Sequence, residues 1–232
     1  RLLAEADVVV LDRLAPQAVL AELASDVEII DVGKMPDHHP IPQEQINQIL
    51  IDRAKQGLVV VRLKGGDPYV FGRGGEELIA CRNAGVQVEV VPGVTSAIAV
   101  AAAAGIPVTH RGVARGFSVV TGHEELAELP ARGDHTIVLL MGVGTLAHSA
   151  ITLARGERGA DCPVAVIEAG FGQRQRVTVG PLDTTAAPAA EPRPTRAPSE
   201  PPAAGAPDRA RVSLLVDPCP AAATFPGEVH DP

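Results

Sequence analysis

The sequence VVRLKGGDPYVFGRGGEE, which spans residues 60–77, decides the fold of this chain. It joins an apolar, β-branched run to the start of a helical pattern through a glycine-rich loop. Gly65 and Gly66 permit backbone conformations and a close ligand approach that other residues do not. The loop is not a Walker loop, which needs Gly-Lys before Ser or Thr, nor a dinucleotide loop, because Glu77 replaces the third glycine. Asp67 repels phosphate and suits ribose hydroxyls, an ammonium or a sulfonium; a plain strand-to-helix turn is the alternative.

The same alternation of strand and helix extends to both sides of this loop. Apolar runs predict strands at residues 8–11, 27–32, 58–63 and 86–91. Helical spacing predicts helices at residues 16–23, 43–54, 76–83 and 95–104, with Gly57 and Gly85 as stops after two of them. This order predicts an open α/β sheet in which ligands bind at the carboxyl ends of the strands.

A second α/β unit follows a boundary that we expect near Arg115. Strands are predicted at residues 117–121, 136–141, 163–168 and 176–179, with a helix at residues 146–153. The chain then becomes rich in Pro and Ala, and its strand-like exception is Val212–Val216. We therefore expect three regions, which are an N-terminal α/β domain at residues 1–115, a C-terminal α/β domain at residues 116–184, and a disordered tail at residues 185–232.

Composition excludes several classes of function. Hydrophobic residues make up 46% of the 232 residues, enough for a sizeable core, and aromatic residues only 2%, too few to stack bases. A net charge of −8 argues against nucleic-acid binding. Cys81, Cys162 and Cys219 are too scattered for a disulfide framework or a zinc motif, which favours a reducing, cytoplasmic location. The sequence shows no signal-peptide order and no apolar run of membrane length, so we expect no membrane partner.

A second candidate binding segment is VVPGVTSAIAVAAAAGIPVTHR, at residues 90–111. Pro92 and Gly93 break the strand, and Thr95 and Ser96 open the next helix. The free N–H groups and hydroxyls at such a helix start can hold a carboxylate or an amino-acid group. An ordinary capped helix explains the same residues.

Charged residues at strand ends form the third candidate site. Asp12 and Lys34 each follow a strand and are plausible acid and base partners, although a solvated ion pair is the alternative. His38 and His39 are adjacent, so their side chains diverge, and without a third ligand we expect no metal. They suit solvent or an anionic substrate. Further basic residues near strand and loop ends suggest an anionic small molecule or ordinary surface charge: Arg13, Lys34, Lys64, Arg73 and Arg111.

Taken together, these segments resemble those of the uroporphyrinogen-III C-methyltransferases, which are tetrapyrrole methylases that use S-adenosyl-L-methionine. The matching segments in the first half of the chain are ADVVVLDRL (6–14), VGK (32–34), HHPIPQEQIN (38–47) and VVRLKGGDPYVFGRGGEE (60–77). Those that follow are EVVPGVTSAIA (89–99), AGIPVTHR (104–111), VTGHE (120–124) and LLMGVG (139–144). The resemblance extends from Arg1 to about Leu182.

The resemblance implies a fold of two α/β domains, open sheets with a cleft between them, usually in a homodimer. It implies two methyl transfers from S-adenosyl-L-methionine to ring carbons of uroporphyrinogen III, a small-molecule tetrapyrrole, giving precorrin-2 for sirohaem or cobalamin synthesis. A methylase of a later precorrin is an alternative, disfavoured by HHPIPQEQIN and GRGGEE. A non-catalytic remnant that binds tetrapyrrole or dimerises is another.

The resemblance also assigns roles to residues. It makes Asp12 the proton acceptor and Lys34 the proton donor. Contacts to the methyl donor fall on Gly65, Gly66, Asp67, Val70, Thr95, Ser96, Met141 and Gly170. Substrate contacts fall on Arg13, His38, His39, Arg73 and Arg111. The family's first strand and a Gly-Pro-Gly-Asp loop precede the segment that begins at Arg1, so we expect the chain as printed to bind the methyl donor weakly.

Overall fold

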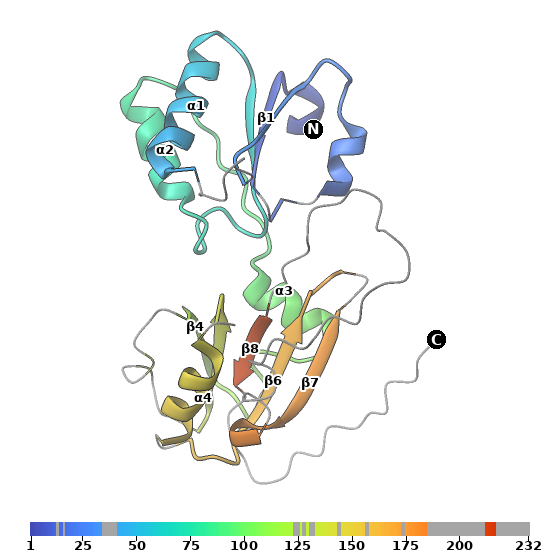
Figure 1. Ribbon diagram of the computed structural model, residues 1–232, viewed down its shortest axis with the longest axis vertical. Helices are drawn as coiled ribbons and strands as arrows, with labels where there is room; N and C mark the ends of the chain where they lie inside the picture. The colour runs from blue at the N-terminus through green and yellow to red at the C-terminus, as the bar shows by residue number, and fades with distance from the viewer. Residues whose placement is uncertain are drawn as a thin grey trace. The chain divides into compact units, whose positions relative to one another are not determined.

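The structure, a computed structural model, describes residues 1–12, 14–15, 17–33, 41–122, 126, 129, 133–142, 145–155, 158–172, 175–184 and 212–216. The chain divides into two compact units, Arg1–Thr95 and Ser96–Pro232. In Figure 1 the first unit carries β1, α1 and α2, and the second carries α3, α4 and the larger sheet. The division precedes the boundary expected near Arg115, because the helix that begins at Ser96 packs on the sheet of the second unit.

The first unit is built on three parallel strands in the order β2-β1-β3. Its elements are η1 (Leu2–Glu5), β1 (Val8–Leu11), η2 (Gln17–Glu22), β2 (Glu28–Asp31), α1 (Gln43–Lys55), β3 (Val60–Leu63) and α2 (Gly74–Asn83). All four residues of the central strand β1 are buried, as expected for a parallel strand covered on both faces. The helix predicted at residues 16–23 is the short 3-10 helix η2, too short to hold a regular α-helical ladder.

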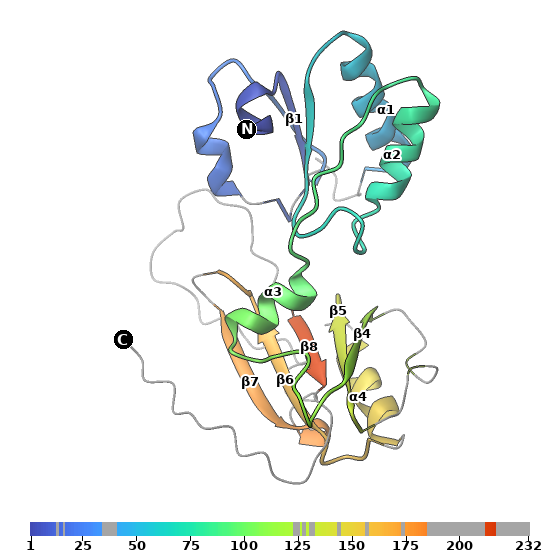
Figure 2. The same cartoon turned by 180° about the vertical axis from the view of Figure 1, so that it is seen from behind.

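Alternate residues of β1 face two separate cores. Val8 and Val10 pack with Ile46 and Leu50, one turn apart on α1, and with Cys81 of α2. On the other face β1 packs against residues of the flanking 3-10 segments. Helices α1 and α2 lie side by side (Figures 1 and 2).

The strand predicted at residues 86–91 is absent from the described structure. A strand needs a hydrogen-bonded neighbour, and no described residue forms a ladder with this segment. Val86 and Val88 nevertheless pack against the core shared with α1 and α2. The apolar pattern of this segment therefore reflects packing of its valines against the core and not pairing with another strand.

The second unit holds a mixed sheet in the order β4-β5-β8-β6-β7. Its elements are α3 (Ser96–Ala103), β4 (Gly116–Thr121), β5 (His135–Leu140), α4 (Leu146–Arg155), β6 (Pro163–Glu168), β7 (Arg176–Pro181) and β8 (Val212–Val216). Strand β8 corrects the expectation of a disordered tail for its five residues, since it pairs antiparallel with both β5 and β6. Pairing on both sides satisfies the backbone groups that β5 and β6 would otherwise leave open. The rest of residues 185–232 lies outside the described residues.

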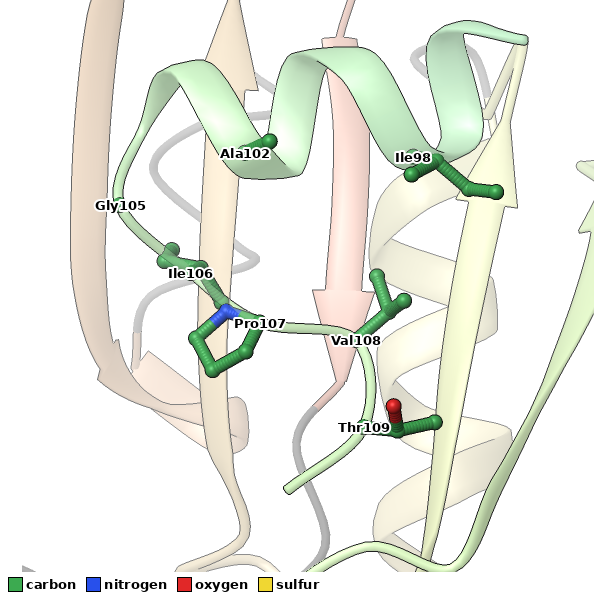
Figure 3. A pocket seen from close by; sticks show the side chains of 7 residues that line it. All are labelled: Ile98, Ala102, Gly105, Ile106, Pro107, Val108 and Thr109. Carbon is green, nitrogen blue, oxygen red and sulfur yellow. The ribbon is translucent and has the colours of Figure 1, made fainter. Parts of the chain in front are cut away.

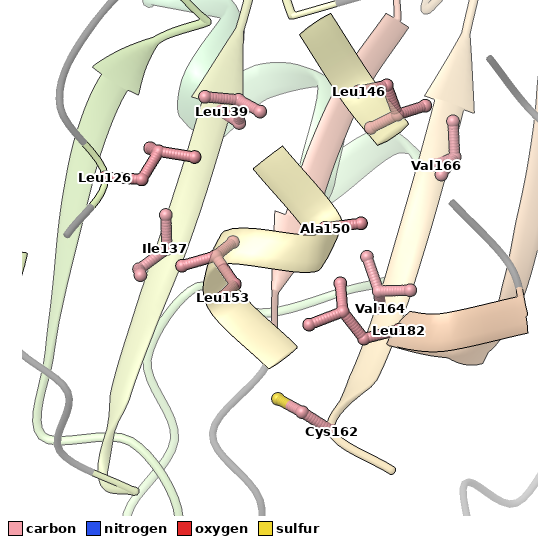
Figure 4. Close-up of a cluster of buried hydrophobic side chains, with 10 residues drawn as sticks. All are labelled: Leu126, Ile137, Leu139, Leu146, Ala150, Leu153, Cys162, Val164, Val166 and Leu182. Carbon is pink, nitrogen blue, oxygen red and sulfur yellow. The ribbon is translucent and has the colours of Figure 1, made fainter. Parts of the chain in front are cut away.

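Two helices cover opposite faces of this sheet. Leu146, Ala150 and Leu153 of α4 point between β5 and β6 into the cluster drawn in Figure 4. Ala97 and Ala101 of α3 pack against the other face, where α3 crosses the strands (Figure 2). The small side chains let α3 approach the sheet closely, and this contact holds it in the second unit.

Candidate active site

The carboxyl ends of the parallel strands in the first unit bring two predicted segments together. Asp12 follows β1, and Gly65, Gly66 and Asp67 follow β3, which is paired with β1. The two loops touch through their backbones, because a Cβ added at Gly65 would lie 2.4 Å from the carbonyl oxygen of Leu14. The glycine is therefore required by the close approach of the two loops.

Asp67 fastens the glycine-rich loop to the segment that follows α2. Its Oδ1 accepts the Tyr69 N–H at 2.8 Å and its Oδ2 accepts the Gly93 N–H at 3.0 Å. A Cβ added at Gly93 would lie 2.3 Å from the carbonyl oxygen of Gly66, so the two segments meet without side chains between them. The pKa of Asp67 lies below its ordinary value because first Gly93 and then Tyr69 donate to the charged form. Asp67 thus keeps its negative charge beside bare backbone.

Asp12 is held by a different partner on each carboxylate oxygen. The Leu14 N–H donates to Oδ1 at 2.9 Å, and the Arg62 Nη2 lies 3.6 Å from Oδ2. The Asp12 side chain is 27% exposed, so a ligand can reach it. A fixed, partly exposed carboxylate at a sheet's carboxyl edge can act as a general base.

A buried polar network that the sequence analysis missed lies behind Asp12. Glu77 Oε1 accepts from Arg62 Nε at 3.1 Å, Lys64 Nζ at 3.4 Å and Gln43 Nε2 at 3.3 Å. The Glu77 and Lys64 side chains are each only 7% exposed. Burial, and then the neighbouring Arg62, lower the pKa of Lys64, while Glu77 and Asp12 oppose this. The available signal was an arginine within an apolar strand, since buried charges are almost always paired.

The remaining predicted residues of the glycine-rich loop differ in their surroundings. Val70 is exposed, and Arg73 precedes α2 with a φ of 57°. The Arg73 guanidinium donates to both Glu76 carboxylate oxygens, at 2.8 and 2.7 Å, which raises its pKa. Thr95 is the last residue of the first unit, and Ser96 begins α3 in the second.

In the second unit, two residues predicted to contact the methyl donor lie at the carboxyl-terminal edge of the sheet, where two of its strands end. Strands β5 and β6 both run antiparallel to β8, so Met141 after β5 and Gly170 after β6 share that edge. Met141 is 53% exposed and has a φ of 55°. A Cβ added at Gly170 would lie 2.7 Å from both methyl groups of Val100 on α3. Ala169 and Phe171 also have positive φ, and such strained residues concentrate at functional sites.

Several predicted residues lie outside the described ranges. They are Arg13, Lys34, His38 and His39. Arg111 is described and exposed, within the turn that joins His110 to Ala114.

Other kinds of site receive little support from the described residues. Within those ranges no group of three or more His, Cys, Asp and Glu side chains is arranged to hold a metal ion. No helix in the described part of the chain has the length and apolar character to cross a membrane. Cys81 and Cys162 are buried, and burial raises the pKa of the Cys81 thiol, which disfavours a reactive thiolate there.

An open pocket of about 450 Å³ lies between α3 and residues 105–109 of the second unit (Figure 3). Ile98 and Val108 face it, and Thr109 is its one side-chain hydroxyl. No predicted site residue and no ionisable side chain lines it. It therefore offers apolar contact and no group for acid, base or nucleophilic chemistry.

Comparison with known proteins identifies the family. The family model of the tetrapyrrole (corrin/porphyrin) methylases matches residues 1–186. The chain belongs to the tetrapyrrole methylases. A relative from Methanosarcina barkeri is named S-adenosyl-L-methionine-dependent uroporphyrinogen III methyltransferase. It is 47% identical to this methylase over 207 residues, which cover 86% of this chain and 81% of that protein.

Solved structures agree with this assignment. The crystal structure of uroporphyrin-III C-methyltransferase from Thermus thermophilus complexed with S-adenyl homocysteine has a TM-score of 0.70 and 37% identity, covering 93% of this methylase and 88% of that chain. A cobalt precorrin-4 methyltransferase has a TM-score of 0.74 and 23% identity, covering 93% and 85%, and shares the fold. The matched residues 1–186 contain every predicted site residue, from Asp12 to Gly170.

Proposed function

We propose that this methylase transfers methyl groups from S-adenosyl-L-methionine to two ring carbons of uroporphyrinogen III, giving precorrin-2 for sirohaem or cobalamin synthesis. The observation that supports this most strongly is the 47% identity over 207 residues to a protein named for that donor and that substrate. A partly exposed carboxylate, Asp12, supports the proposal because such a group can act as a general base.

The loop after β3 suits a ligand with a positive charge and hydroxyl groups. Gly65 packs against the Leu14 backbone with no space for a Cβ, Gly66 has a φ of 75°, and the Asp67 carboxylate stays charged. S-adenosyl-L-methionine supplies an electrophilic methyl group on a cationic sulfur. We assign its binding to Gly65, Gly66, Asp67, Val70, Thr95, Ser96, Met141 and Gly170.

Asp12 accepts the proton that the reaction releases. When a pyrrole carbon gains the methyl group, the macrocycle acquires a positive charge. Loss of a proton from the macrocycle removes this charge. The Leu14 N–H donates to Asp12 Oδ1 at 2.9 Å, whereas Arg62 Nη2 lies 3.6 Å from Oδ2, so Oδ2 is the oxygen assigned to take this proton. Lys34 is assigned as the proton donor.

The substrate is a polycarboxylate, and basic side chains suit its carboxylates. We assign substrate binding to Arg13, His38, His39, Arg73 and Arg111. Because Arg73 is paired with Glu76, a substrate carboxylate would replace Glu76 as its partner. The proposal includes a cytoplasmic location and a homodimer. Sedimentation equilibrium tests the homodimer.

Mass spectrometry of the reaction product tests the proposal. The purified protein is incubated anaerobically with S-adenosyl-L-methionine and, in separate reactions, with uroporphyrinogen III and with later precorrins. Uroporphyrinogen III carrying two added methyl groups, and no methylation of the later precorrins, is the expected result. Methylation of a later precorrin alone would assign the enzyme to another step. Tetrapyrrole binding without any methylated product would support the non-catalytic alternative and refute the proposal.

A further inference from the structure

Strand β3 carries a charged side chain within an otherwise apolar run. Arg62 follows Val60 and Val61 and lies opposite Val10 in the parallel ladder with β1. Its side chain is 13% exposed, and a guanidinium at this depth requires partners for its donors. The chemistry proposed above makes no use of it.

The partners of Arg62 fix the plane of its guanidinium. Nε donates to Glu77 Oε1 at 3.1 Å, and Nη1 donates to the carbonyl oxygens of Val10 and Leu63, both at 3.3 Å. Because the guanidinium is planar, these contacts also set the direction of Nη2. Nη2 lies 3.6 Å from Asp12 Oδ2.

Glu77 is a rigid anchor for this arrangement. It lies in the first turn of α2 and accepts hydrogen bonds from Gln43 of α1, from Lys64 after β3 and from Arg62. The two cations Arg62 and Lys64 balance the two anions Glu77 and Asp12, so the buried group is neutral as a whole. Residues of α1 and of β3 with its following loop therefore hold the carboxylate that orients Arg62.

We propose that Arg62, anchored by Glu77, is a positioning residue for the proton acceptor Asp12. With the Leu14 N–H on Oδ1 and Arg62 beside Oδ2, the Asp12 carboxylate is held in one orientation. A base held in this way stays aligned with the proton it must accept, and a displacement of about 1 Å costs roughly 100-fold in rate. This inference rests on the proposed methyl transfer to uroporphyrinogen III, in which Asp12 is the base.

Steady-state kinetics of Arg62→Gln and Arg62→Lys test the proposal. Both variants are expected to fold, because Lys64 still neutralises Glu77, and circular dichroism checks this. We expect Arg62→Gln to lower kcat roughly ten- to one-hundred-fold. The KM for uroporphyrinogen III and the Kd for S-adenosylhomocysteine should change by less than about twofold, because the contact acts on the base. Arg62→Lys keeps the charge but loses the planar fork, so its kcat should be intermediate.

A double variant separates positioning from a general structural effect. In an Asp12→Asn background, Arg62→Gln should cause no further loss, because the group that it orients is gone. The matched control is Arg53→Gln, which removes an arginine paired with Glu28 at 2.9 and 2.7 Å in the same unit and should leave kcat unchanged. An equal loss in both backgrounds, or a rise in KM at constant kcat, would overturn the proposal.

If the wild-type protein does not methylate uroporphyrinogen III, that result refutes the proposed function but not the effect of Arg62 on Asp12. A spectroscopic measurement tests this effect without turnover. The carboxyl carbon-13 resonance of Asp12 reports the charge beside it. It should shift in Arg62→Gln and stay in place in Arg53→Gln. A resonance unaffected by Arg62→Gln would show that Arg62 does not act on Asp12.

Discussion

Replacing Glu77 by glutamine removes the carboxylate that neutralises two buried cations. Arg62 Nε and Lys64 Nζ lie 3.1 and 3.4 Å from Glu77 Oε1, and both side chains are largely buried. Removal of one partner from a buried ion pair typically costs about 3–5 kcal/mol. Since the glutamine oxygen still accepts one hydrogen bond, we expect a loss near the lower limit, about 3 kcal/mol.

The destabilisation should depend on pH through Lys64. In the folded protein the pKa of Lys64 is below the ordinary lysine value, which means that burying the charged ammonium costs free energy of folding. This cost is complete at every pH below the pKa that Lys64 has in the folded protein. This penalty fades as the pH rises from the folded pKa towards the unfolded one. Glu77 raises the pKa of Lys64, so Glu77→Gln lowers the folded pKa further. The stability difference between variant and wild type should therefore shrink as the pH is raised into the alkaline range.

Urea unfolding followed by Tyr69 fluorescence measures this effect. Tyr69 is the only tyrosine of a chain without tryptophan, so it reports on the first unit. The matched control is Glu76→Gln, which removes a neighbouring carboxylate whose partner Arg73 is exposed, and it should leave the urea midpoint nearly unchanged. Equal midpoints for Glu77→Gln and Glu76→Gln, or a difference that grows with pH, would refute the reasoning.

Two further predictions concern the glycine-rich loop. Gly93→Ala should destabilise the first unit by about 1–3 kcal/mol, because the added Cβ would lie 2.3 Å from the Gly66 carbonyl oxygen. In the control Gly75→Ala the added Cβ meets no atom within 4 Å, and this variant should stabilise α2 by about 0.5–1 kcal/mol. Urea midpoints that fall equally in both variants would contradict this prediction. The amide resonances of Gly93 and Tyr69 should titrate together at a pH below the ordinary pKa of an aspartate, because both amides donate to the Asp67 carboxylate and its protonation weakens both hydrogen bonds. Since the pKa of Asp67 is lowered in the folded protein, the stabilisation by these hydrogen bonds is present at neutral pH and lost on acidification. Amide resonances that show no common titration would contradict the role of Asp67 in joining the two segments.

Local sequence pattern was enough to predict most elements of the fold. The apolar run Val8–Leu11 is the buried central strand, and Gly57 and Gly85 follow α1 and α2 with φ of 83° and 81°. These features depend on residues that are neighbours in sequence, such as a helix end that needs a positive φ. The glycine-rich loop also follows β3 and precedes α2 as predicted.

The features that sequence reasoning missed depend on distant partners. The pattern of Val212–Val216 is strand-like, but the composition around it is that of a disordered tail, and its pairing depends on two strands far away in the sequence that lie on either side of it. Residues 86–91 have the pattern of a strand but no neighbouring ladder among the described residues. The role of Arg62 follows from its position beside Glu77 and Asp12, which only the packing of α2 on the sheet establishes.

The rate of methyl transfer by Asp12→Asn, compared with the wild type at saturating uroporphyrinogen III and S-adenosyl-L-methionine, tests the role of this carboxylate most directly. Asparagine keeps the size and the hydrogen bond from Leu14 but does not accept a proton. We predict a fall in kcat of roughly 100-fold or more with the affinity for S-adenosylhomocysteine unchanged. A variant that methylates uroporphyrinogen III at the wild-type rate would contradict the assignment of Asp12 as the base.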